Sequence, residues 1–235
     1  SSLLVRDCFD VCSGIKEYQV GKGKPKQTMA DKEGRVFNSN IKHSELYRRE
    51  LRGKNINRYS ISWNNEYIKY GEWIAEPRQS SYFEGERLLV RQIPGLNNLI
   101  VSYTNEDYII DQTLYVAKLN SDKFYLLFTL GFFNSRIIYW YFSNLYNEFD
   151  NLFPKIKTNE FKDLPIPNIG LRAQQPIIDL VEQILKTKKA KPQADTTELE
   201  QEIDLLVYKL YDLTYDEVLI VDPETSISRE KYCGD

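Results

Sequence analysis

The sequence predicts an α+β fold: a small, twisted, mainly antiparallel sheet with a long buried helix, followed by a C-terminal helical hairpin module. Three observations predict it. Short runs rich in β-branched and aromatic residues alternate with turn residues between Trp63 and Leu119. An apolar, aromatic-rich stretch follows at residues 123–146, and apolar residues recur at helical spacing in the last third of the chain. With 235 residues, 42% of them hydrophobic, the chain is long enough to bury the core of such a fold.

The first 60 residues are polar and interrupted by turn residues. Within them, residues 20–28 read VGKGKPKQT, where glycine and proline alternate with lysine. Such a run suits neither a helix nor a central strand, so we expect an exposed loop here.

Strands are expected between Trp63 and Leu119. Turn residues Pro94, Gly95, Asn97 and Asn98 separate the second strand-like run from the third, which favours antiparallel pairing. The runs are residues 66–70, 87–93, 99–104 and 108–118.

Residues 123–146 are apolar enough to raise the question of a membrane span. Asn134, Ser135 and Arg136 fall near the middle of this stretch. An arginine at the centre of a bilayer costs about 2.5 to 3.5 kcal/mol on the insertion scale. We therefore expect a buried core helix rather than a membrane span.

Helical patterns dominate after Pro167, and one short helix precedes it. A short helix is expected from Thr158, and LPIP at residues 164–167 predicts an extended exit from the first domain. Pro176 suits the first turn of the next helix. We accordingly divide the chain into a domain at residues 1–168 and a helical module at residues 169–235.

Two further helices are expected in that module. One begins near residues 195–197, where Thr197 and Glu200 have the spacing of a capping box. Residues 214–217 repeat this spacing at the start of a third, short helix. The first two helices are amphipathic and joined by a short connector, so we expect a hairpin that buries its apolar stripes.

Charge is unevenly distributed along the chain, whose net charge is −3. Residues 1–100 hold 17 Lys and Arg against 12 Asp and Glu, whereas residues 171–235 hold 8 against 14. The front segment is therefore suited to hold a polyanion, while the acidic tail faces solvent or a protein partner. A chance asymmetry of solvated surfaces is the alternative.

The three cysteines and the single histidine do not form a metal-binding pattern. Cys8, Cys12 and Cys233 have no C-x-x-C spacing, and His43 has no second histidine nearby. We therefore expect no metal site and reduced thiols. Because no secretory signal precedes the cysteines, we expect a cytoplasmic location. The only methionine is Met29, so we expect the chain to be part of a longer polypeptide.

No catalytic motif is recognisable. The sequence has no Asn/Asp-Pro-Pro-aromatic tetrapeptide, the loop that stacks on a flipped adenine, and no Walker or G-x-S-x-G sequence. Residues 9–14 (FDVCSG) hold one glycine, too few for an S-adenosylmethionine turn. Residues 84–87 (EGER) lack the lysine that a metal-dependent nuclease needs. We expect neither catalytic residues nor a cofactor in this chain.

Several short motifs occur in a characteristic order over about residues 45–170, and one more lies in the tail. The motifs are LRGKNINRY (51–59), AEPR (75–78) with RLLVRQ (87–92), FNSR (133–136), FPKI (153–156), LPIP (164–167) and EIDLLVYKLY (202–211).

In this order the motifs resemble the C-terminal target-recognition (specificity) domain of TaqI-type adenine-specific DNA methyltransferases and type IIG restriction-modification enzymes. They are also similar to the recognition domains of type I specificity subunits. Asn55 stands where the similar motif of the family has aspartate. The resemblance implies a bacterial domain that recognises a double-stranded DNA sequence and positions the target adenine for a catalytic domain absent from this chain. The parent protein would then be a site-specific DNA adenine methyltransferase that uses S-adenosylmethionine, with or without an endonuclease activity.

The implied partners are double-stranded DNA and a methyltransferase catalytic domain, in cis or in trans, and no membrane. Two alternatives stay open. The chain could be a stand-alone, type I-like specificity half-subunit. It could also be a protein-interaction module that does not bind DNA, with its 17 tyrosines and helical stripe as the contact surface.

Sequence-specific DNA binding needs cations on phosphates and Arg, Lys, Gln or Asn at base edges. Residues of these kinds occur on the 20–28 loop, at expected turns and strand ends, and after Pro154. Each cation has an ordinary solvated surface as its alternative role, and Arg91 a structural ion pair. The DNA-binding candidates are Lys22, Lys24, Lys26, Gln27, Thr28, Lys54, Arg58, Arg78, Arg91, Gln92, Lys155 and Lys157.

Overall fold

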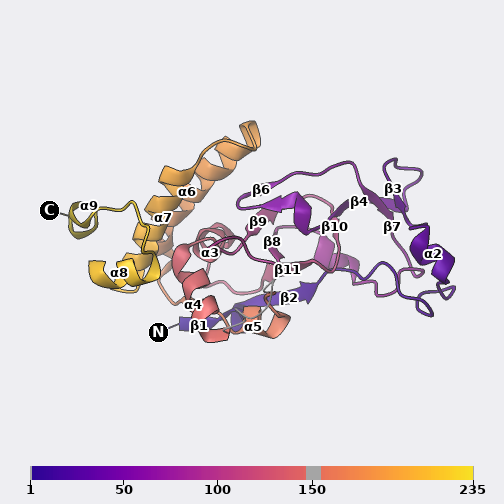
Figure 1. The fold of residues 1–235 in the computed structure, drawn as a ribbon, viewed down its shortest axis with the longest axis horizontal. Coiled ribbons are helices and arrows are strands. Elements are labelled where there is room, and N and C mark those ends of the chain that lie inside the picture. Colours follow the sequence, from indigo (N-terminus) through magenta and orange to yellow (C-terminus); the bar gives the residue numbers. More distant parts are fainter. Residues whose placement is uncertain (1, 147–154, 235) are drawn as a thin grey trace.

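A four-stranded antiparallel sheet forms the centre of the molecule in the computed structural model, which describes residues 2–146 and 155–234 (Figure 1). The turn expected at residues 94–98 is confirmed, because Gly95 and Asn98 form a bridge between the second and third strand-like runs. In spatial order the strands are β2 (Phe9–Ser13), β11 (Leu114–Leu119), β8 (Arg87–Arg91) and β9 (Val101–Thr104).

This central sheet is buried on both faces. In β8, Leu88 and Val90 belong to one hydrophobic core and Leu89 to another. The same alternation separates Tyr115 from Val116 in β11. Because successive side chains of a strand point to opposite faces, both cores are built on this sheet, one on each side.

A second sheet lies at the end of the molecule opposite the C-terminal helices (Figure 1). The run expected at residues 108–118 is divided between the two sheets, because the side chain of Asp111 accepts a hydrogen bond from Thr113 N (3.0 Å) in a turn. The strands, in spatial order, are β10 (Ile109–Ile110), β4 (Tyr47–Leu51), β7 (Tyr67–Lys69) and β3 (Asn38–Ser39), of which β10 and β4 are parallel.

Short elements complete this part of the chain. The short helix from Thr158 and the extended segment at residues 164–167 are both confirmed, and the latter pairs with the N-terminal strand. The 20–28 loop precedes α2 as an exposed turn-rich segment. These elements are β1 (Ser2–Leu4), α1 (Val5–Cys8), α2 (Met29–Glu33), η1 (Gly53–Asn55), β5 (Ile56–Asn57), β6 (Ser60–Ile61), η2 (Ser80–Phe83), α5 (Thr158–Lys162) and β12 (Pro165–Pro167).

The apolar stretch at residues 123–146 forms two helices rather than one, α3 (Leu126–Phe133) and α4 (Arg136–Tyr146). Asn134 lies between them and is fully buried. Its side chain accepts a hydrogen bond from Val101 N (3.1 Å) and donates one to Val101 O (3.0 Å). Asn134 thus satisfies the edge of β9, and the chain leaves the helical path there. No helix among the described residues is long and apolar enough to cross a membrane.

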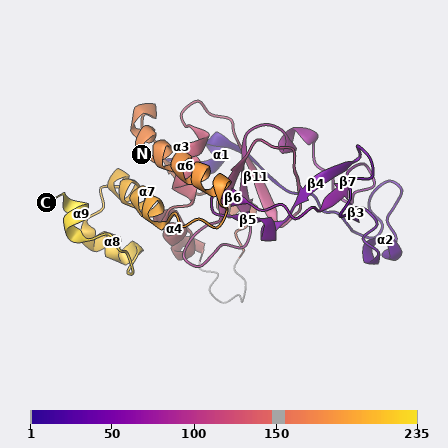
Figure 2. The ribbon, with the colours of Figure 1, turned by 90° about the horizontal axis from the view of Figure 1, so that it is seen from above.

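The tail contains the expected hairpin, α6 (Leu171–Ala190) and α7 (Thr197–Leu210), followed by α8 (Tyr215–Val221) and α9 (Arg229–Cys233) (Figure 2). Pro176 does not lie in the first turn of α6, because this helix begins at Leu171. The cap of α8 is confirmed: Thr214 Oγ1 accepts a hydrogen bond from Glu217 N (3.3 Å). The α6–α7 hairpin packs on α3.

The hairpin shares one hydrophobic core with the central sheet. Phe9 and Phe132 belong to the same buried cluster as Ile177 and Val207. At Gly131, an added Cβ would lie 2.8 Å from the Ile177 side chain, so this glycine lets α3 approach α6 closely. The boundary between residues 168 and 169 stays a prediction.

Candidate nucleic-acid interface

Four carboxylates converge on the Arg52 guanidinium at the β-rich end. Glu17 lies at 2.5 Å, Glu50 at 3.1 Å, Glu66 at 3.3 Å and Asp111 at 4.0 Å. They come from four separate segments, which meet because β4 lies between β10 and β7. The cluster therefore holds these four segments together beneath a polar surface.

Burial controls the ionisation of this cluster. Burial and the neighbouring Glu17 raise the pKa of Glu50 to about 9. Burial also opposes ionisation of Glu17, but the hydrogen bond with Glu50 and the charges of Arg52 and Arg35 lower its pKa below the ordinary value. Burial raises the pKa of Asp111. Because the raised pKa favours the protonated form of Glu50 at neutral pH, the cluster carries less negative charge against the positive charges of Arg35 and Arg52.

Two adjoining pockets open beside this cluster, and both are lined by Arg35 and Arg52. Their volumes are about 220 and 490 Å³. Amide and hydroxyl groups can both donate to and accept from base edges, whereas the arginine and lysine side chains only donate. The remaining polar side chains around the two openings are Glu17, Tyr18, Lys32, Asn38, Ser39, Asn40, Lys54, Glu66, Asp111 and Gln112.

The lysines of the 20–28 loop are exposed at the same end of the molecule (Figure 1). Lys24 lies 3.8 Å from Glu72, and Lys22 and Lys26 extend into solvent. Gly23 adopts a φ of 81°, and an added Cβ would lie 2.2 Å from the Trp73 carbonyl oxygen. The loop is therefore held close to the β-rich end with its cations outward.

Gln27 and Thr28 use their functional groups to hold the loop rather than extend them into solvent. Gln27 is only 3% exposed, and its amide donates to Glu17 O (2.9 Å) and Trp73 O (2.7 Å). Thr28 Oγ1 accepts from Asp31 N (3.2 Å) and thereby caps α2. The buried Gln27 fixes the loop from within, and the exposed Thr28 fixes its end at the start of α2.

Further candidates lie along one border of the pockets. Gln92 Nε2 donates to Gln112 O, and Gln92 O accepts from Ile156 N (2.8 Å), which places the exposed Lys155 beside them. Arg91 lies close to Gly53, and burial lowers the pKa of its half-buried side chain.

Lys54 is also at this border and is exposed, with its ammonium 2.6 Å from Glu66. The structure therefore brings the 20–28 loop, Lys54, Arg91, Gln92 and Lys155 to the surroundings of the two pockets.

Three candidates instead make contacts within the protein. Arg58 binds Glu200 of α7 (2.7 Å) and donates to Asn134 O (2.8 Å). Arg78 Nε donates to Ser13 O (3.0 Å). Lys157 lies 3.1 Å from Glu160 at the start of α5.

Sequence reasoning named Lys54, which lines the larger pocket, but missed Arg35 and Arg52, which line both. Arg52 stands in the LRGKNINRY motif, so its motif position was a usable signal. Arg35 and Gln112 stand in no recognisable pattern, and only the folded chain brings them together.

The sequence model of the TaqI-like C-terminal specificity domain matches residues 48–166, just over half of the chain. The chain belongs to this family. A comparison with curated proteins found no match.

Solved structures share the fold of this specificity domain at low sequence identity. The type IIL restriction-modification enzyme MmeI, solved in complex with DNA, has a TM-score of 0.54 and 13% identity over 99% of this chain and 35% of its own. A type I restriction-modification structure has a TM-score of 0.50 and 14% identity over 90% and 44%. The HsdS subunit from Thermoanaerobacter tengcongensis has 0.45 and 14% over 90% and 44%. The chain spans less than half of each of these proteins.

Asn55 of the LRGKNINRY motif supports the scaffold of this specificity domain. Asn55 Oδ1 accepts from Arg52 N (2.8 Å), and its Nδ2 donates to Ser62 O (2.9 Å). An aspartate at this position would keep the first bond and lose the second, because a carboxylate does not donate. Phe153 and Pro154 of the FPKI motif lie outside the described residues.

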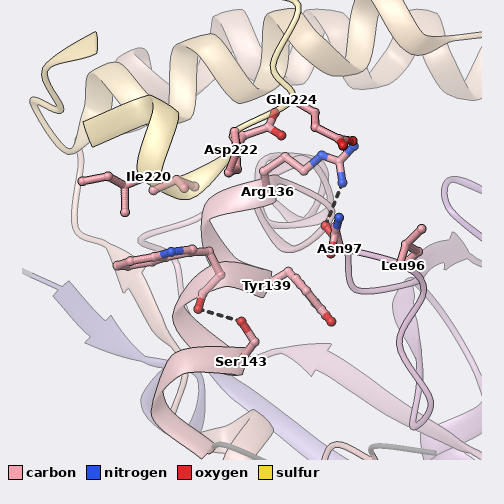
Figure 3. A pocket seen from close by; sticks show the side chains of 11 residues that line it. Leu96, Asn97, Arg136, Tyr139, Ser143, Ile220, Asp222 and Glu224 are labelled. Carbon is pink, nitrogen blue, oxygen red and sulfur yellow. Dashed lines mark hydrogen bonds between the residues drawn. The ribbon is translucent and has the colours of Figure 1, made fainter. Parts of the chain in front are cut away.

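Another pocket, of about 480 Å³, lies at the helical end of the specificity domain between α4, α8 and the 94–98 turn (Figure 3). Arg136 Nη1 donates to Asn97 O (3.0 Å) within it. Figure 3 shows Asp222 and Glu224 beside the Arg136 side chain. This pocket is lined from the helical end, away from the β-rich end that holds the two polar pockets, so it is separate from the candidate nucleic-acid interface.

Proposed function

We propose that this specificity domain recognises a short sequence of double-stranded DNA and positions a target adenine for a methyltransferase catalytic domain, in cis or in trans. One observation carries the proposal: the exposed lysines of the 20–28 loop and the two polar pockets lie at the same end of the molecule. Lysines on phosphates supply affinity and register, while polar side chains in a groove read bases.

The family and one relative support this assignment. TaqI-like specificity domains serve sequence recognition in restriction-modification systems. The structure of MmeI, which shares this fold, was solved with DNA. In this proposal the domain acts in the bacterial cytoplasm.

S-adenosylmethionine belongs to the catalytic domain in this proposal, because the turn at Gly14, directly after β2, does not fit it. An added Cβ at Gly14 would lie 2.0 Å from Asp111 O. Backbone from the neighbouring strand therefore fills the space that a cofactor would need.

Binding of the chain to a pool of random duplexes at two salt concentrations tests the proposal. The logarithm of the association constant should fall linearly with the logarithm of salt, by about 0.9 for each phosphate neutralised. Absence of affinity at low salt would contradict DNA recognition and would favour the protein-interaction module.

A type I-like specificity half-subunit is the second candidate, favoured by the shared fold with a type I structure at a TM-score of 0.50. The reading frame upstream of Ser1 separates the two. A cofactor turn and an Asn-Pro-Pro-aromatic motif in the same polypeptide support the methyltransferase in cis. A frame that begins at this chain supports the half-subunit.

A further inference from the structure

Arg35 has an unusual position at the junction of the two pockets. It lines both of them, and its side chain is 49% exposed. Its backbone φ is 46°, in the left-handed region that residues other than glycine rarely adopt. Such backbone conformations persist where the surrounding structure holds them and are frequent at ligand-binding sites.

The Arg35 guanidinium is fixed from two sides. Its Nη2 donates to Glu17 Oε2 (3.0 Å), and its Cζ lies 5.6 Å from the centre of the Tyr18 ring. Glu17 is only 7% exposed and is held in turn by Arg52 at 2.5 Å. Glu17, which holds Arg35, is therefore itself buried and fixed by Arg52.

Tyr18 is equally well fixed. Its hydroxyl donates to Asn38 Oδ1 (2.8 Å) and accepts from Phe37 N (2.8 Å). Its ring stacks on Phe37 with 5.2 Å between centroids. The residues that hold Arg35 are already ordered, so little conformational entropy is lost when a ligand binds. Such preorganisation favours hydrogen bonds of defined geometry over attraction by charge alone.

The carboxylate of Glu17 determines what Arg35 can recognise. An anion 3.0 Å away cancels much of the field that would attract a phosphate. It uses one of the five N–H donors of the guanidinium and leaves the others to a neutral acceptor pair. The major-groove edge of guanine presents two such acceptors, O6 and N7, to a bidentate arginine.

We propose that Arg35 reads one guanine of the DNA site in the major groove, with Glu17 and Tyr18 as its positioning residues. This inference rests on the DNA-recognition function proposed above. The neighbouring Gln112 and Asn40 are placed to contact adjacent base pairs from the same pockets.

Selection of bound duplexes from a randomised pool tests the inference with three forms of the chain. The wild type should yield a consensus that includes one strongly preferred guanine. Arg35→Lys keeps the charge but loses the fork, and should lower the preference for that guanine about tenfold or more while preserving the other positions. Lys32→Ala, on the rim of the same pocket, is the matched control and should weaken binding without changing the consensus.

A base analogue supplies the sharper measurement. Replacement of the preferred guanine by 7-deazaguanine removes the N7 acceptor and should weaken wild-type binding about tenfold. Arg35→Lys should lose less affinity on this replacement than the wild type does, because a lysine reaches N7 or O6 without the planar fork. Equal thermal unfolding of the variant and the wild type checks that the fold is retained, and Arg35→Gln replaces Arg35→Lys if it is not.

Two results would overturn the inference without affecting the proposed function. In one, the Arg35 variants weaken all sequences equally, which indicates a phosphate contact. In the other, the consensus and the 7-deazaguanine effect are unchanged in the variants. Failure of the wild type to select any sequence, even at low salt, would reject the proposed function and this inference with it.

Discussion

Arg52 binds carboxylates from four segments of the chain and thereby fixes the strands of the second sheet relative to one another. The side chain is 21% exposed, whereas Glu50 is fully buried. An ion cluster of this kind is sensitive to the loss of one partner, because the remaining charges stay buried without compensation. Arg52 therefore holds in place the segments that line the two pockets.

Replacement of Arg52 by Gln should lower the free energy of unfolding by about 3 kcal/mol, since the buried Glu17 would lose its main counter-charge and Glu66 one of its two. Urea denaturation measures the change. Lys54→Gln is the matched control: Lys54 is exposed and pairs with the same Glu66, so it should cost less than about 1 kcal/mol. Equal losses in both variants would contradict the central role of Arg52.

Single residues also show where sequence reasoning reached its limit. Glycine and proline between the lysines of residues 20–28 were enough to predict an exposed loop. They did not show that Gln27 turns inward, because that depends on the carbonyl groups of Glu17 and Trp73, which are distant in sequence. Arg35 escaped prediction for the same reason.

At the scale of elements, the best predicted parts are those whose pattern is local. The strands β8 and β9 and the helices α7 and α8 follow from apolar spacing, turn residues and a cap. Strand β2 was missed because its five residues, FDVCS, include Asp10 and Ser13, which are uncommon in strands. It forms through pairing with β11, a tertiary interaction.

The division of the apolar stretch into α3 and α4 has two polar anchors. Asn134 bonds to the edge of β9, and Asp204 of α7 accepts a hydrogen bond from Arg136 N (2.8 Å) at the start of α4. Both partners lie far away in sequence, so the composition of residues 123–146 could predict burial but not the break.

Asp204 should make stability depend on pH. Burial raises its pKa to about 7, although the bond from the Arg136 backbone opposes the shift. In the unfolded chain the pKa of an aspartate is about 3.9. Because the folded value is the higher one, the stabilisation by the bound proton is complete below about pH 4 and is lost as pH rises through about 7.

Asp204→Asn keeps an oxygen that accepts the hydrogen bond from Arg136 N, but its side chain no longer binds or releases a proton. The free energy of unfolding of this variant should therefore increase relative to that of the wild type as pH rises from about 4 to 7, by at most about 1.4 kcal/mol per pH unit. Urea denaturation at about pH 5 and about pH 8 measures the gap between the two proteins. A gap that is the same at both values would show that Asp204 does not carry a raised pKa.

At the scale of the whole molecule, the two ends differ in charge and composition. The β-rich end presents the loop lysines and the polar pockets, whereas the other end is built from the acidic segment at residues 171–235 (Figure 1). The charge asymmetry visible in the sequence thus becomes an asymmetry in space. It predicts that a nucleic acid approaches from the β-rich end.

Two sets of lysines distinguish this orientation from a general attraction between cations and DNA. Lys22, Lys24 and Lys26 are exposed at the β-rich end, and Lys186, Lys189 and Lys191 are exposed on and after α6. Replacement of the first set by Ala should reduce the slope of log association constant against log salt by up to about 0.9 per lost phosphate contact, and should weaken all sequences alike. Replacement of the second set removes the same charge and should leave the slope nearly unchanged. Equal effects of the two triple variants in a fluorescence titration would place DNA at neither end in particular, since net charge alone would then account for binding.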